Sequence, residues 1–305
     1  MFNLLQKKSN ITETTFINTS IYKNTNINTT IIKYSILVIN DSLQKNQFNI
    51  LNNEYLSIKD IFLLDKRNNS FINPNKMMIS NFIYSIDAKR EIDNDIISNN
   101  WKSFINYHLS EDFNNQLFDT FNTYNKLKIN NKIIKYDKIN SSSVNVSRNT
   151  PLNNFMFLKC ISPINYFNKN LNIKEIDNNK LFIGWFFLKK DNDFSIGGSL
   201  TIFKKYIQYT KCIKKTTFID QETNQEKDTE IEEIKEEEIK DCIISIPYQQ
   251  NTLIILSIEE INQNNKNEPY TEKDNISEVK LYYEFEPRNI TFQSQRYIEF
   301  GLEKI

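Results

Sequence analysis

Apolar runs and polar turns are most clearly separated over residues 181–205, LFIGWFFLKKDNDFSIGGSLTIFKK. Its first eight residues are rich in aromatic and β-branched side chains, which is typical of a buried strand. A polar turn and the pair Gly197-Gly198 follow, and then a second strand, SLTIF. The pattern predicts a β-hairpin. Because the chain has only four glycines, we expect this pair where φ is positive or where two backbone segments approach closely.

Short apolar runs separated by polar turns continue through the C-terminal half of the chain. We expect strands at residues 154–166, 181–189, 198–206, 242–247, 252–257, 279–286 and 294–301. So many short strands favour a mainly β, jelly-roll-like core over about residues 154–301. On the pattern alone, a hairpin in some other all-β core explains the same run equally well.

Helical periodicity precedes this core and predicts helical support over about residues 41–122. KYSILVIN, residues 33–40, is typical of a strand, and Asp41-Ser42 then supplies a helix N-cap. Two more helices are expected between residues 98 and 122, the second capped by Ser110. The apolar faces of the three helices are, in order, Phe48, Leu51 and Tyr55; Trp101, Phe104, Ile105 and His108; and Phe113, Leu117 and Phe121.

Several polar segments interrupt this pattern. Residues 1–32 fit either a poorly ordered arm or an edge strand, so we expect an N-terminal arm followed by a single domain over residues 33–305. The charge run 220–241 is predicted to be a solvated insertion. The alternative is a weak helix that binds a protein partner. Loops are expected at the remaining polar segments, residues 61–80, 122–150 and 262–275.

The composition adds few constraints on function. Lys and Arg together number 38, as do Asp and Glu, so no net charge favours nucleic acid or an anionic membrane as a partner. The richness in Asn with a single Ala indicates AT-rich codons and a viral or AT-rich microbial source. No apolar run reaches the roughly 18 residues of a membrane span, which predicts a soluble cytoplasmic protein, or one of the host cytoplasm or virion. The spacing of Cys160, Cys212 and Cys242 indicates ordinary reduced thiols.

Two segments, LFIGWFFL with GGSLTIF and ISIPYQQNTLIIL (residues 244–256), resemble the 2-oxoglutarate and Fe(II)-dependent dioxygenases of phages and other viruses. WKSFINYHLSEDF resembles the helices that precede the barrel in that family, so the likeness covers about residues 33–300. The resemblance implies a double-stranded β-helix, the cupin-like form of the jelly roll. It also implies structural roles for Gly197, Gly198, Pro247 and Asn251.

Enzymes of this family hold Fe(II) with two His and one carboxylate, whereas this chain has one His. The resemblance aligns Glu175 with the first His, Asp177 with the carboxylate and Tyr283 with the second His. These degenerate metal positions offer only oxygen donors, which suit Mg²⁺, Mn²⁺ or Ca²⁺ better than a redox iron. His108 falls outside the barrel strands, and we expect it to be a packed helix residue.

Arg296, in SQRYIEF, matches the arginine that grips the distal carboxylate of 2-oxoglutarate in the family; the alternative is a structural arginine. With the iron triad incomplete, the resemblance implies a degenerate, non-catalytic binding or scaffolding protein, and no cofactor is expected. A second hypothesis is an active hydroxylase that uses Fe(II) and 2-oxoglutarate at an atypical metal centre. A third is an unrelated all-β viral structural protein.

Overall fold

The structure is a computed structural model, and most of its described residues lie in two antiparallel β-sheets. The predictions for residues 61–80 and 262–275, and for most of 1–32 and 122–150, lie outside the described residues. The residues that the structure describes are 18–23, 32–57, 60, 83–124, 128–129, 132–133, 154–161, 173–177, 180–219, 226–260, 279–288 and 294–303.

The larger sheet has seven strands and the smaller has four, which confirms the prediction of a mainly β protein. The seven-stranded sheet runs, in spatial order, β1 (Asn18–Lys23), β2 (Ile32–Asn40), β11 (Thr252–Glu260), β8 (Lys180–Phe187), β13 (Gln295–Glu303), β6 (Asn154–Ile161) and β3 (Ile83–Asp87). The four-stranded sheet runs β10 (Glu226–Ile246), β9 (Leu200–Ile219), β12 (Lys280–Phe285) and β7 (Lys174–Glu175). A separate small hairpin joins β4 (Lys128–Ile129) and β5 (Lys132–Ile133).

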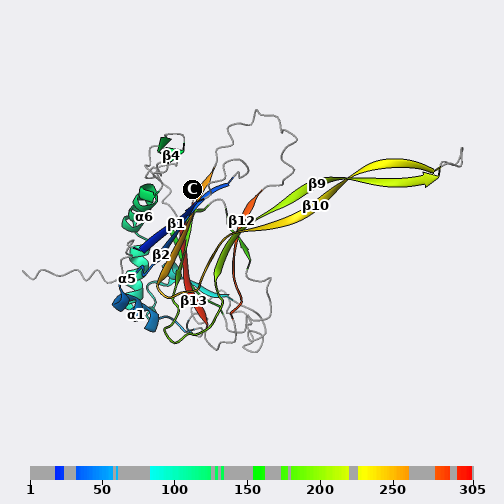
Figure 1. Cartoon of the computed structure of the whole chain (residues 1–305). Helices are drawn as coiled ribbons and strands as arrows, with labels where there is room; N and C mark the ends of the chain where they lie inside the picture. Colours follow the sequence, from blue (N-terminus) through cyan, green and yellow to red (C-terminus); the bar gives the residue numbers. More distant parts are fainter. Residues whose placement is uncertain are drawn as a thin grey trace, which may run out of the picture.

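Helices cover the face of the seven-stranded sheet that lies away from the four-stranded sheet (Figure 1). They are α1 (Lys45–Asn53), α4 (Ala88–Glu91), α5 (Asn99–His108) and α6 (Glu111–Tyr124). Two apolar clusters result: one joins the helices to the seven-stranded sheet, and the other fills the space between the two sheets. The molecule therefore has three layers, and the seven-stranded sheet is the middle one.

Alternation along a strand decides which core each side chain enters. In β13, Ile298 and Phe300 belong to the cluster beneath the helices, whereas Tyr297 belongs to the cluster between the sheets. Glu299 has the same parity as Tyr297 and also lies between the sheets, where it contacts Tyr283 of β12. Arg296 has the opposite parity and faces the helical layer.

The predicted hairpin over residues 181–205 is wrong as a pairing, although both of its strands exist. β8 pairs with β11 and β13 in the seven-stranded sheet, whereas β9 pairs with β10 and β12 in the four-stranded sheet. The segment 188–199 therefore crosses from one sheet to the other. The sequence pattern shows two strands and a turn, but which strand pairs with which depends on partners far along the chain.

The charge run is neither a solvated loop nor a helix over the residues described. β9 and β10 pair from Leu200 with Ile246 to Ile219 with Glu226, with one shift of register between Cys242 and Ile244. They form a two-stranded ribbon that projects from the body (Figure 1). Glu and Lys have low strand propensity, so the composition of this run does not predict a strand. The strand β10 forms because it pairs with β9.

The start of α1 also differs from the prediction. Asp41 has φ 52°, and the helix begins only at Lys45, with no side-chain cap. The side chain of Asn251 holds this corner instead: its Oδ1 accepts from the Leu43 amide at 2.9 Å and its Nδ2 donates to the Leu43 carbonyl at 2.7 Å. The cap predicted at Ser110 is confirmed, since its Oγ accepts from the Phe113 amide at 3.2 Å.

Candidate functional site

Three polar side chains meet between the two sheets, and we call Lys159, Glu299 and Tyr283 the interior polar cluster. Lys159 of β6 forms an ion pair with Glu299 of β13. The Tyr283 hydroxyl donates to Glu299 Oε2 at 2.8 Å. Trp185 of β8 packs on Tyr283, with 5.0 Å between ring centroids. Charged and aromatic side chains thus occupy the space between the two sheets.

The electrostatics of the cluster follow from its burial. Burial lowers the pKa of Lys159 to about 8, although the charge of Glu299 opposes that shift. Burial alone would raise the pKa of Glu299, but the positive charges of Lys159 and Lys174 outweigh it, so its pKa lies below the usual value. Burial, and then the Glu299 charge, raise the pKa of Tyr283 well above its usual value. At neutral pH the cluster holds an ammonium, a carboxylate and a neutral phenol.

The residues aligned with the family's metal ligands do not converge. Glu175 and Tyr283 lie on adjacent strands of the four-stranded sheet but on opposite faces, because Glu175 is in register with Tyr282. Glu175 is on the outer face, where it pairs with Lys280 at 2.9 Å and accepts from the Tyr282 hydroxyl at 3.2 Å. Asp177 is exposed just beyond β7.

This arrangement does not fit a metal ion held by Glu175, Asp177 and Tyr283. A facial set of ligands must point at one centre, whereas Tyr283 points between the sheets and Glu175 points out of them. Among the residues described, no group of three or more His, Cys, Asp and Glu side chains comes close enough to hold a metal. Glu175 and Tyr283 therefore do not face one common site in the structure.

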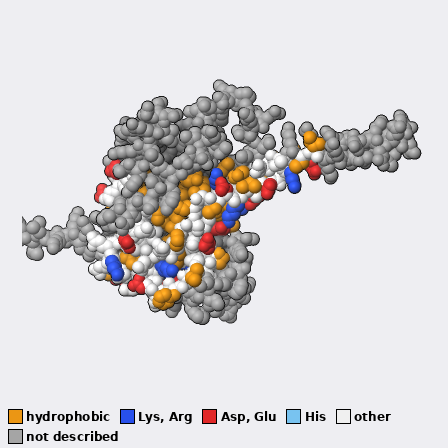
Figure 2. All heavy atoms as spheres, viewed as in Figure 1, with side chains coloured by type: hydrophobic (Ala, Val, Ile, Leu, Met, Phe, Trp, Pro, Cys, Tyr) orange, Lys and Arg blue, Asp and Glu red, His pale blue; other side chains and the backbone are white. Residues whose placement is uncertain are grey.

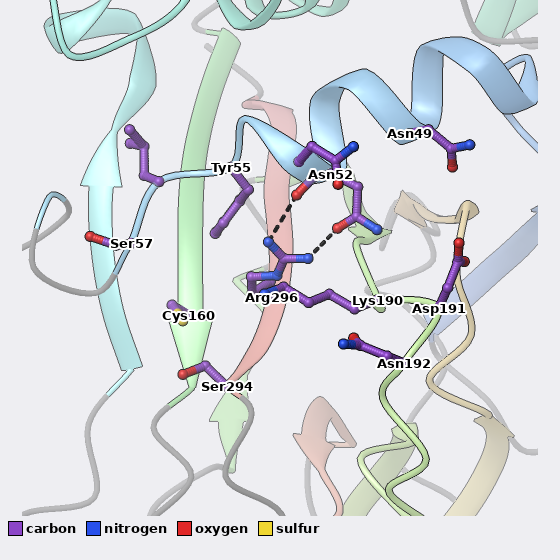
Figure 3. A pocket seen from close by; sticks show the side chains of 12 residues that line it. Asn49, Asn52, Tyr55, Ser57, Cys160, Lys190, Asp191, Asn192, Ser294 and Arg296 are labelled. Atoms are coloured by element: carbon purple, nitrogen blue, oxygen red, sulfur yellow. Dashed lines mark hydrogen bonds between the residues drawn. The ribbon is translucent and has the colours of Figure 1, made fainter.

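Arg296, the predicted 2-oxoglutarate contact, lies on the helical side of the seven-stranded sheet. Figure 3 shows its guanidinium directed at Asn52, at the end of α1. Nη1 donates to the Asn52 carbonyl at 3.0 Å, and Nη2 donates to Asn52 Oδ1 and, at 3.1 Å, to the Leu188 carbonyl. The guanidinium also lies 5.0 Å from the centre of the Tyr55 ring. Within the part of the chain that the structure describes, Arg296 therefore joins the helix to two strands of the sheet.

A cavity of about 670 Å³ opens beside Arg296. Polar side chains from α1, from the turn after β8 and from the start of β13 line it (Figure 3). Its charged members are Lys190, Asp191 and Arg296. Three of the five N–H donors of Arg296 bond to backbone and amide oxygens, so its guanidinium has a structural contact on this side of the cavity.

Gly197 and Gly198 lie against Pro287 and Arg288 at the turn between the two sheets. Gly197 and Gly198 have φ values of 90° and 78°, which confirms the prediction of positive φ. A Cβ at Gly197 would lie 2.3 Å from the Pro287 carbonyl oxygen. Arg288 Nη1 lies 2.9 Å from Asp193 Oδ2, and both side chains are buried. This turn is therefore fixed by backbone approach and by a buried ion pair.

The remaining structural positions behave in different ways. Asn251 has φ 54° and holds the corner before α1. Pro247 is exposed and directly follows the end of β10. His108 lies in the core, where its Nδ1 lies 2.8 Å from the Phe104 carbonyl oxygen and burial lowers its pKa to about 3. The prediction that His108 is a packed helix residue is confirmed.

Lys159 and Glu299 were missed from the sequence, although a signal for them exists. Each interrupts an apolar run, in FMFLKCI and in RYIEFGL. A single charge inside a strand that is apolar on both sides indicates a buried partner of opposite sign. The sequence does not show which of many charged residues that partner is.

No protein-family model matches the sequence, and no curated protein matches it. Among the described residues, none of the helices has the length and apolar character needed to cross a membrane.

Proposed function

We propose that this protein is a non-catalytic binding or scaffolding protein built on a double-stranded β-helix of the 2-oxoglutarate dioxygenase type. The observation that carries the proposal is the interior polar cluster. Lys159, Glu299 and Tyr283 satisfy one another between the sheets and fill the space with protein side chains. A catalytic iron would instead need side chains there that are free to bind the metal, and open coordination positions for the cosubstrate and oxygen.

The strand order supports the barrel part of the proposal. Among the strands from β6 to β13, the first pairs with the last, and β7 with β12, β8 with β11 and β9 with β10. These pairs alternate between the sheets and give the orders β6-β13-β8-β11 and β7-β12-β9-β10. One long antiparallel hairpin folded over on itself produces such an order, which is the topology of a jelly roll.

The positions of the candidate ligands support the non-catalytic part. Glu175 faces outward and pairs with Lys280, whereas Tyr283 is bound to Glu299 between the sheets. Arg296 bonds to Asn52 and Leu188 on the other side of the seven-stranded sheet. Glu175, Tyr283 and Arg296 each thus have a different, structural contact.

An anaerobic Fe(II) titration followed by a succinate-release assay with 2-oxoglutarate tests the proposal. We expect no stoichiometric iron on the purified protein after dialysis, and no more succinate than in a protein-free control with the same iron. The same assay on Glu175→Ala and Asp177→Ala should give unchanged background values.

Turnover of 2-oxoglutarate that Glu175→Ala and Asp177→Ala abolish would overturn the proposal in favour of an active hydroxylase. Glu286→Ala is the matched control, since Glu286 is another exposed carboxylate beside the four-stranded sheet. Loss of turnover in that variant too would indicate damage to the fold rather than loss of a metal ligand.

A further inference from the structure

The ribbon formed by β9 and β10 extends far beyond the sheet from which it starts. β12 covers only the segment from Leu200 to Lys205 of β9. Beyond it, residues 206–219 and 226–239 pair only with one another among the described residues. At about 3.3 Å per residue this part is about 45 Å long, and Figure 1 shows it leaving the body. A two-stranded hairpin alone is marginally stable in water, so a ribbon of this length indicates a partner.

Charge is divided between the two strands of the ribbon. β9 carries five Lys and no acidic residue. β10 carries nine Asp and Glu against three Lys. Cross-strand ion pairs link them near the body, with Lys205 Nζ 2.8 Å from Glu238 and Lys204 Nζ 3.0 Å from Asp241. The ribbon is thus basic along one strand and acidic along the other.

One face of the ribbon also exposes large apolar side chains. Ile213 and Ile234 are 63% and 61% exposed. They lie diagonally across the strand pair on the same face, because Ile234 is in register with Lys211, two residues from Ile213. Tyr209 shares that face, which continues the outer face of the four-stranded sheet. Where Figure 2 colours the ribbon, it shows hydrophobic side chains interspersed with charged ones.

We propose that this face binds the same face of a second copy of the chain, so that two ribbons stack as a symmetric dimer. A twofold axis along the ribbon places β9 of each copy over β10 of the other. That arrangement brings the basic strand of one copy over the acidic strand of its partner and covers Ile213 and Ile234. A twofold axis across the ribbon would instead place the Lys-rich strand of one copy over the Lys-rich strand of the other. Repulsion between like charges disfavours that arrangement.

A second copy suits this surface because a twofold rotation about the ribbon axis places the basic strand of one copy over the acidic strand of the other. A partner that is only basic or only acidic would match one strand and repel the other. A face about 45 Å long and about 10 Å wide buries roughly 900 Å² in total when two copies stack, which is below the size of stable specific interfaces and in the range of weak, transient ones. The dimer is therefore weak and reversible. The inference is independent of the barrel's chemistry, so succinate release does not bear on it.

Sedimentation velocity of the full chain between about 1 and 100 μM tests the association. We expect a concentration-dependent monomer–dimer equilibrium for the wild type. The dissociation constant should rise about 100-fold or more in the double variant Ile213→Asp, Ile234→Asp, because each copy loses two apolar side chains that the dimer buries. Phe194→Asp is the matched control, since Phe194 is 87% exposed but lies off the ribbon. A monomer at every concentration, or equal weakening by the control, would overturn the proposal.

Crosslinking tests the geometry with Ile213 and Ile234 left in place. In a background with Cys212→Ser and Cys242→Ser, we mix protein carrying Tyr209→Cys with protein carrying Glu236→Cys and add a short bismaleimide. These two positions are in register within one ribbon, so the axis along the ribbon places each over the other in the partner. Crosslinked peptides joining position 209 to position 236 are the expected product. Products joining only like positions would overturn the stacking arrangement.

Discussion

The ammonium of Lys159 contacts the carboxylate of Glu299 between the two sheets, where the side chains are 6% and 9% exposed. Neither charge can be solvated there, so each depends on the other. Removing one partner leaves an uncompensated buried charge. Replacing both with uncharged side chains of similar size leaves none.

We therefore expect Lys159→Met and Glu299→Gln each to lower the free energy of unfolding by about 3–5 kcal/mol, and the double variant to lose less than either single one. Urea denaturation at pH 7 measures all three. The control is Lys205→Met with Glu238→Gln on the ribbon, an exposed pair expected to contribute under about 1 kcal/mol. Additive losses in the double variant would show that the two charges do not depend on each other.

Arg296 is expected to matter for stability rather than for dicarboxylate binding. Arg296→Ala leaves the Asn52 and Leu188 carbonyls of a buried contact without donors, which costs about 1–3 kcal/mol for each unsatisfied group. Arg296→Lys keeps the charge but loses the planar fork, so it should restore only part of the loss. Thermal denaturation checks this order. Calorimetry with 2-oxoglutarate that shows binding in the wild type and none in Arg296→Ala would restore the cosubstrate role.

The sequence was most informative where a rule is local. The turn glycines needed no partner to be recognised, because a chain with four glycines that keeps two together restricts them to special backbone geometry. The start of α6 could also be recognised from neighbouring residues alone, because Ser110 caps the helix and acidic residues follow in its first turn. The short apolar runs also predicted the strands between residues 154 and 301. Most of the predicted strand ends lie within a few residues of the ends that the structure describes.

Pairing and side-chain direction could not be read in the same way. A shift of one residue moves a strand's side chains to the other face, which separates Glu175 from Tyr283 and directs Arg296 toward the helices. The charge run was misread because propensity describes isolated residues, whereas β10 is held by β9 and by cross-strand ion pairs. The interior polar cluster joins strands far apart in the chain, so no local pattern links Lys159 to Glu299.

Gly197 should tolerate no side chain. At φ 90° an L-residue is strained, and its Cβ would lie 2.3 Å from the backbone oxygen of Pro287. We expect Gly197→Ala to lower the free energy of unfolding by about 1–3 kcal/mol or more. Gly184→Ala is an informative comparison, because its Cβ would meet the ring of Phe300, a side chain, with the nearest atom at 2.5 Å. Equal stability of Gly197→Ala and wild type in urea denaturation would contradict the backbone approach described at this turn.

His108 should make the protein sensitive to mild acid. Its pKa is about 3 in the folded protein because of burial, against a usual value of 6.5. The unfolded chain therefore binds one more proton than the folded chain between these values, so the free energy of unfolding falls as pH decreases from 6.5 toward 3. Above pH 6.5 both states are neutral at this site and the effect vanishes.

His108→Phe isolates this effect, because a phenyl ring does not titrate but can keep the contact with the ring of Phe104, whose centroid lies 3.9 Å away. The difference in unfolding free energy between wild type and variant should change by about 2 kcal/mol from pH 7 to pH 5, with the wild type losing more. Carboxylates titrate in both proteins and cancel in the difference. Since the chain has a single histidine, the imidazole proton resonance of the folded protein offers a direct check. A midpoint near 6.5 in that titration, or parallel stability curves, would mean that His108 is charged in the folded state and is not buried as described.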